Sequence, residues 1–220
     1  DGSFDKYGYP DVPAHVFINT SVIAKAPKEY FWAGVGDGIS KAPEVEHAVA
    51  AAVERGVELP HTAVLGAAIA ASSKDAFYKY GEQGIKDVEN GTVSKAIEEV
   101  ALDIVVSTGY ASNLVNQDDF YYNSCHAHAF YNATTAIKKE KEPLHGQVVS
   151  FGVMVLHAYF NELEELKKVA VFNKKLGLPV TLEEIGLKVS DAEKITELAM
   201  QTNEYKQTPF DKEKYIEAIK

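Results

Sequence analysis

The helical spacing of apolar residues from Ser21 onward most constrains how this chain of 220 residues folds. Within residues 93–107, apolar side chains recur at intervals of three and four, the pattern of one buried helix face: Ile97, Val100, Ala101, Ile104 and Val105. Similar patterns predict helices over residues 44–55, 61–82, 148–160, 162–176, 190–202 and 210–219, and another from a cap at 116–119 to about residue 138. We therefore predict a mainly α fold, a helical bundle.

Glycine and proline positions predict where several of these helices begin and end. Pro27 suits the first position of a helix, and the glycines at 34, 36 and 38 predict that this helix ends there and lets another approach closely. The helix over residues 61–82 is expected to break near Gly81 and Gly84, and Gly56 suits the position just after the helix over 44–55.

Residues 1–20 differ from the rest, because an alternating stretch at 3–7, a turn-like stretch at 9–13 and a β-rich run at 15–19 predict up to two short strands. We interpret them as the terminal strands of another domain. Residues 21–220 then form one helical domain. The absence of an initial methionine favours the interpretation that the chain is a piece of something longer.

Charge and cysteine content exclude several classes of partner. The net charge of −10, with a single arginine, Arg55, argues against nucleic-acid binding. No signal peptide opens the chain, and the longest apolar run, 63–71, is too short to span a bilayer. The single cysteine, Cys125, fits a reducing compartment. We expect a soluble cytoplasmic protein with no nucleic-acid and no membrane partner.

Asp37, His128 and His145 are the candidate metal ligands. They come from three separate predicted helices, and two imidazoles with one carboxylate are the usual donors for a catalytic divalent cation. His126 lies two positions from His128, on nearly the opposite helix face, so both cannot reach one metal. The alternative is that each residue is a helix cap or a hydrogen-bonded core group. Cys125 is interpreted as a buried, inert thiol.

Several segments, taken in order, resemble the iron-containing (group III) alcohol dehydrogenase superfamily, most closely its glycerol dehydrogenase-like branch. The resemblance is carried by Ala-Gly-Val-Gly-Asp at 33–37, His-Ala-Phe-Tyr-Asn at 128–132 and His-Gly at 145–146, together with residues 18–20, 23–27 and 176–186. It covers nearly the whole chain, but only the C-terminal half of the family's pattern.

This resemblance implies a helical C-terminal domain of the dehydroquinate synthase-like fold, with Asp37, His128 and His145 as ligands of zinc or iron. It also implies an N-terminal Rossmann-like domain, absent here, that holds NAD or NADP. This sequence has Tyr131 where many relatives have a further histidine.

The function implied is the metal-binding half of an NAD(P)-dependent alcohol or polyol dehydrogenase, with a small-molecule alcohol or polyol as substrate and a homo-oligomeric state. The chain alone is expected to show no turnover, because hydride transfer needs the bound nicotinamide. Two alternatives remain. One is a related dehydrogenase of hydroxycarboxylates or a glycerol phosphate, for which Lys41 is the basic candidate, and the other is a non-catalytic helical assembly domain.

Overall fold

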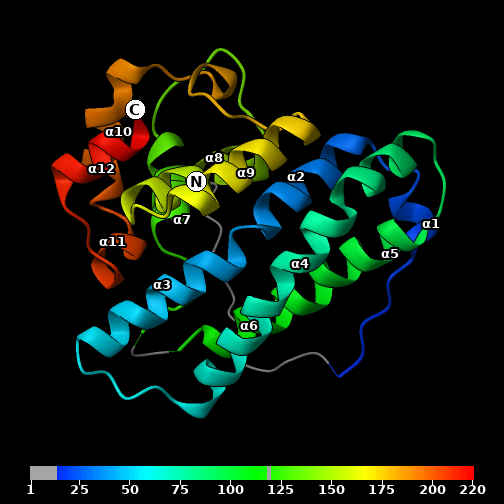
Figure 1. Cartoon of the computed structure of the whole chain (residues 1–220), viewed down its shortest axis with the longest axis horizontal. Coiled ribbons are helices and arrows are strands. Elements are labelled where there is room, and N and C mark those ends of the chain that lie inside the picture. The colour runs from blue at the N-terminus through cyan, green and yellow to red at the C-terminus, as the bar shows by residue number, and fades with distance from the viewer. Residues whose placement is uncertain (1–13, 118–119) are drawn as a thin grey trace, which may run out of the picture.

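The computed structural model describes residues 14–117 and 120–220 (Figure 1). In these residues the regular secondary structure is helical, and an isolated antiparallel bridge joins Asn116 to Tyr121. This confirms the prediction of a mainly α fold. The helices are α1 (Thr20–Ile23), α2 (Lys28–Gly38), α3 (Lys41–Glu54), α4 (His61–Glu89), α5 (Lys95–Leu102), the π-helix η1 (Asp103–Ser107), α6 (Thr108–Val115), α7 (His126–Thr134), α8 (His145–Tyr159), α9 (Leu163–Leu176), the 3₁₀ turns η2 (Glu183–Ile185) and η3 (Val189–Asp191), α10 (Ala192–Ala199), α11 (Asn203–Gln207) and α12 (Lys212–Ile219).

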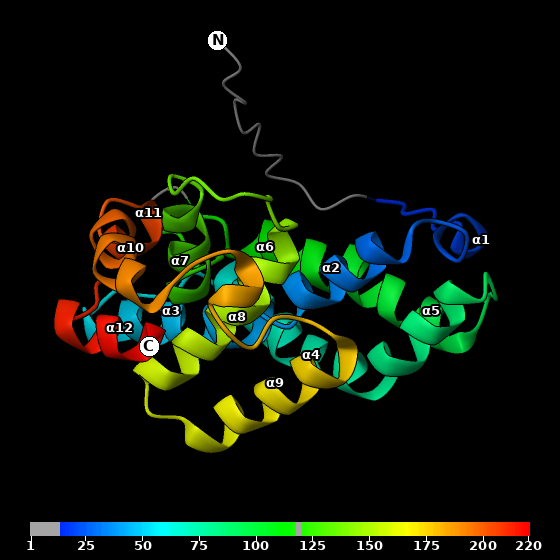
Figure 2. The ribbon, with the colours of Figure 1, turned by 90° about the horizontal axis from the view of Figure 1, so that it is seen from above.

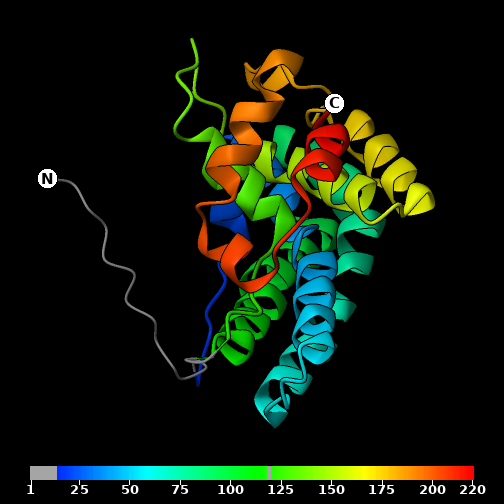
Figure 3. The same cartoon turned by 90° about the vertical axis from the view of Figure 1, so that its left-hand side faces the viewer.

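Helix α8 lies between two hydrophobic clusters and joins them. Its residues Val153 and Leu156 pack into the first cluster with α2 to α6, and its residues Val148 and Val155 pack into the second with α7, α10 and α12. Figures 2 and 3 show α9 on one outer side of α8 and α7 with α10 on the other. The N-terminal end of α8 lies next to α2, which belongs to the first cluster, and α8 also contacts α7, which belongs to the second cluster.

Glycines inside helices allow close packing. Helix α2 ends at Gly38, as predicted, whereas α4 continues through Gly81 and Gly84 to Glu89, which corrects the expected break there. A Cβ atom on Gly84 would lie 2.8 Å from the ring of Phe31. A glycine inside a helix costs about 1 kcal/mol relative to alanine, but here it gives the neighbouring aromatic ring room to pack.

The predicted helix over residues 93–107 is interrupted. Ser94 caps α5 by accepting a hydrogen bond from the Ile97 amide, and the chain then passes through the π-helix η1 into α6. The wider π turn rotates the residues that follow it relative to the α-helical spacing. Val105, within the π turn, is 45% exposed, whereas Ile97 in α5 is buried.

The start predicted for the next helix, with a cap at 116–119, is also wrong. Helix α7 begins only at His126, and residues 118–119 lie outside the described part of the chain. Phe120 and Tyr122 are both buried, with stacked rings whose centroids are 4.2 Å apart. Both rings belong to the first hydrophobic cluster, so this irregular segment is anchored to the core.

The predicted strand at residues 15–19 is absent from the structure, while the predictions over residues 3–13 lie outside the described residues. No described segment pairs with residues 15–19, and a strand needs a neighbour to satisfy its backbone. Instead the Asn19 side chain accepts a hydrogen bond from the Ser21 amide and caps α1.

The predicted helices at 44–55 and 162–176 are confirmed as α3 and α9, and each is followed by a glycine with positive φ, Gly56 and Gly177. None of the helices in residues 14–117 and 120–220 combines the length and apolar character needed to cross a lipid bilayer.

Candidate metal centre

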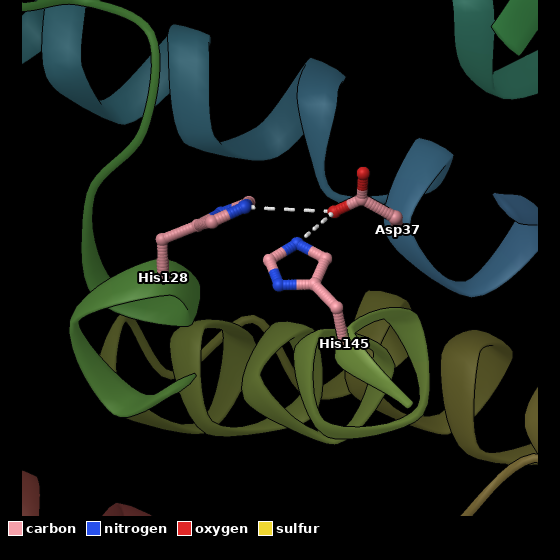
Figure 4. A group of neighbouring side chains, drawn as sticks. All are labelled: Asp37, His128 and His145. Carbon is pink, nitrogen blue, oxygen red and sulfur yellow. Dashed lines mark hydrogen bonds and ion pairs between the residues drawn. The ribbon is translucent and has the colours of Figure 1, made fainter. Parts of the chain in front are cut away.

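The structure brings Asp37, His128 and His145 together at the junction of α2, α7 and α8 (Figure 4). Asp37 lies in the last turn of α2, His128 in the first turn of α7, and His145 is the first residue of α8. The start of α8 is held by Gln147, whose side chain accepts a hydrogen bond from the Leu144 amide at 2.8 Å. His145 therefore projects from a helix end towards the last turn of α2.

The ligand atoms of these three residues have spacings that suit one small divalent cation. The Asp37 Oδ1 atom lies 3.0 Å from His145 Nε2 and 3.5 Å from His128 Nε2. Tetrahedral zinc with bonds of about 2.0–2.1 Å places its ligands about 3.3 Å apart, between these two values. Among the described residues, this is the one group of three or more His, Cys, Asp or Glu donors whose ligand atoms all lie within 4.8 Å of one another.

The charges within the site are strongly coupled. Burial raises the pKa of Asp37, but the hydrogen bonds from His128 and His145 outweigh it and hold this pKa well below its ordinary value. Burial lowers the pKa of His128, but Glu44 and Asp37 outweigh it and raise this pKa to about 10. The side chains of Asp37 and His145 are 40% and 42% exposed, so one side of the group is open to solvent.

Glu44 is a member of this site that the sequence analysis missed. Its side chain is fully buried beneath His128, and the His128 Nδ1 atom lies 2.5 Å from Glu44 Oε2. The signal in the sequence is its position: Glu44 shares one face of α3 with Ala48 and Ala52, both of which are buried. A charged residue on an otherwise apolar helix face calls for a buried partner.

His126 faces a different environment from His128. Its buried ring lies among the rings of Tyr159, Phe160 and Phe210, at centroid distances of 4.7, 4.9 and 5.4 Å. Burial lowers the pKa of His126 to about 3, so its ring is neutral at physiological pH. The thiol of Cys125 is also buried, and burial raises its pKa well above the ordinary value.

Two further residues raised by the sequence analysis lie beside the site. Lys41 is buried, and its Nζ donates hydrogen bonds to the Asn123 backbone oxygen at 3.1 Å and side-chain oxygen at 2.6 Å. Its ammonium group is thus held by Asn123 in the interior of the protein. The ring of Tyr131 packs edge-on against His145, with centroids 4.2 Å apart.

His47 and His157 are not candidate ligands, and both contact the carboxylate of Glu162, away from the candidate metal centre. His157 Nδ1 lies 2.7 Å and His47 Nε2 3.2 Å from oxygens of Glu162, and the His47 ring stacks on Phe160. These contacts connect α3, the end of α8 and the start of α9. Their ligand atoms do not form a further group of the kind found at Asp37.

Comparison with known proteins finds glycerol dehydrogenases that are similar to most of this chain. The chain is 32% identical over 202 residues to glycerol dehydrogenase 1 of Schizosaccharomyces pombe, covering 88% of this chain and 42% of that protein. It is 31% identical over 206 residues to glycerol dehydrogenase of Citrobacter freundii, covering 91% of this chain and 53% of that protein. No protein-family model matches the chain.

A solved structure agrees with these sequence matches. The crystal structure of glycerol dehydrogenase from Schizosaccharomyces pombe superposes with a TM-score of 0.76 at 26% sequence identity, covering 92% of this chain and 52% of that one. The chain thus spans about half the length of the relatives it matches, and the matched part is their C-terminal half.

Proposed function

The chain belongs to the iron-containing alcohol dehydrogenase superfamily, in its glycerol dehydrogenase-like branch, and from this we propose that it is the metal-binding half of an NAD(P)-dependent polyol dehydrogenase. The single observation that carries the proposal is the convergence of Asp37, His128 and His145 on one point from three helices. Relatives named as glycerol dehydrogenases favour a small polyol as substrate.

Asp37, His128 and His145 would hold a zinc or ferrous ion, since two imidazoles and one carboxylate suit either. Such an ion, when bound, supplies Lewis acidity that lowers the pKa of an alcohol hydroxyl and so favours hydride loss to a nicotinamide ring. The exposed sides of Asp37 and His145 leave room for the alcohol to approach. The Lys41 ammonium is buried and bonded to Asn123, which favours an uncharged polyol as the substrate over a hydroxycarboxylate or a phosphate ester.

Metal content tests the proposal directly. The chain is purified without chelator, incubated with zinc or ferrous iron, desalted and analysed by mass spectrometry for metal per chain. We expect about one metal per chain in the unmodified protein and loss of it in His145→Ala, whose exposed side chain has little structural role. His61→Ala, at an exposed histidine outside the site, is the matched control. Failure of the unmodified protein to retain metal would overturn the proposal.

A turnover assay tests whether glycerol oxidation needs a separate nucleotide-binding domain. The described residues contain no strand, and therefore no βαβ unit that could hold a dinucleotide. We expect the 220-residue chain, loaded with metal, to give no increase in absorbance at 340 nm with glycerol and NAD or NADP. Glycerol oxidation by this chain alone would show that it carries a nicotinamide site of its own.

A further inference from the structure

Glu44 makes three hydrogen bonds around the start of α7, one with Cys125 and two with His128. Its Oε1 atom accepts from the backbone amides of Cys125 and His128, each at 2.9 Å. Its Oε2 atom lies 2.5 Å from the His128 Nδ1 atom. With a fully buried side chain, Glu44 is thus fixed from two directions, and the His128 ring is held against it.

The chemistry of these groups determines which ring nitrogen keeps its proton when a metal binds. An ionised carboxylate can only accept hydrogen bonds, so Nδ1 of His128 must be the donor in the contact with Oε2. The other nitrogen, Nε2, is the atom that faces Asp37 at 3.5 Å. Without an ion, Nε2 donates to Asp37; a metal would take the place of that proton, while the proton on Nδ1 stays bonded to Glu44.

We propose that Glu44 is a positioning residue of the metal centre, which holds the His128 ring with Nδ1 protonated and Nε2 directed at the ion. The inference rests on the metal site of the proposed function and adds a residue to it. A carboxylate behind a ligand imidazole fixes the orientation of the ring and increases the basicity of the ligand nitrogen. The two bonds to backbone amides hold the start of α7 on α3, so ring and helix are positioned by one side chain.

The protonation of His128 can be read in the unmodified, zinc-loaded chain by nitrogen-15 NMR of its imidazole. We expect a ring proton on Nδ1, shifted far downfield by the carboxylate and slow to exchange with water, and a zinc-bound Nε2. A zinc-bound Nδ1, or a His128 ring proton on Nε2, would overturn the inference without the need for any variant. His128→Gln identifies the resonances.

The effect on metal affinity separates positioning from a purely structural role. Zinc dissociation constants are measured by competition with a chromophoric chelator for the unmodified chain, Glu44→Gln and Glu46→Gln. Glu46 is exposed on the same helix, so its variant removes the same charge without touching His128. We expect Glu44→Gln to weaken zinc binding about 10- to 100-fold, the usual effect of removing such a partner, and Glu46→Gln to leave it within about twofold.

The outcomes distinguish this inference from the proposed function. If the unmodified chain binds no zinc, the metal site itself is refuted. If it binds zinc and Glu44→Gln folds, by circular dichroism, and binds equally tightly, then Glu44 only caps α7 and the inference is overturned. If Glu44→Gln does not fold, Glu44→Asp and the NMR measurement on the unmodified chain decide the question.

Discussion

Gly36 of α2 lies directly against Gly146 of α8, so that a Cβ atom on Gly36 would be 2.5 Å from the Gly146 carbonyl oxygen. A Cβ atom on Gly146 would in turn overlap the carbonyl oxygen of Ala33. Each glycine is next to a candidate ligand, Asp37 or His145. The close approach of these two backbones therefore sets the separation of the two ligands.

Gly146→Ala is expected to destabilise the protein and weaken zinc binding together. The new methyl group meets backbone rather than a flexible side chain, so α8 must shift away from α2 at a cost of about 3 kcal/mol or more. Urea unfolding and zinc affinity measure both effects. Gly109→Ala is the control, because a Cβ there meets nothing within 4 Å, and its stability should be unchanged or higher by up to about 1 kcal/mol. A Gly146→Ala protein with unchanged stability would contradict the tight packing.

Zinc is expected to raise the melting temperature through the site. At a free concentration about 100 times the dissociation constant, binding adds about 2.7 kcal/mol, which corresponds to about 5–10 °C for a domain of this size. Asp37→Asn should abolish the shift, since it removes the charged ligand while preserving shape. Magnesium at the same concentration should have no effect, because it prefers oxygen ligands. An equal shift in Asp37→Asn would place the zinc elsewhere.

Asp103→Asn is expected to stabilise the protein above pH 6. Burial raises the pKa of Asp103 to about 6, against the hydrogen bond from Ser107, and its Oδ2 atom has no hydrogen-bond partner. Between about pH 4 and 6 the folded state retains a proton that the unfolded chain has released, so stability falls as pH rises. After allowance for solvent screening, the gain should be about 1–2 kcal/mol at pH 7.5 and much smaller at pH 4.5. Urea titrations at both pH values measure it, and equal gains would contradict this account.

The Cys125 thiol is expected to be unreactive in the folded protein. The side chain is fully buried, and burial together with the Glu44 carboxylate raises its pKa, so little thiolate is present. Reaction with a disulfide reagent such as DTNB should be slow in buffer and should reach one thiol per chain only in concentrated urea. Rapid stoichiometric reaction in buffer would show that α7 opens readily.

Much of the helical architecture follows from local sequence. The apolar spacing of α9 and the glycine after it fix both its extent and its end, because Gly177 adopts the left-handed conformation that stops a helix. The motifs around Asp37, His128 and His145 identified the candidate ligands, and the structure brings their donor atoms together. Their role as metal ligands stays a prediction.

What the sequence analysis missed depends on partners distant in sequence. Gly84 packs against Phe31, and only the folded structure shows that this glycine makes room for a ring instead of ending a helix. The π turn before α6 likewise has no local sequence signal that we recognised. Glu44 was missed because its significance lies in contacts with residues more than 80 positions away.

The candidate ligands Asp37 and His145 are 108 positions apart in the chain. In small zinc domains, neighbouring ligands capture the ion early, and the ion organises the fold around it. Here the chain must first close a long loop and bury both clusters flanking α8, which is a slow, non-local event. A metal held by these residues would therefore be captured at the end of folding, after the helices have assembled without it.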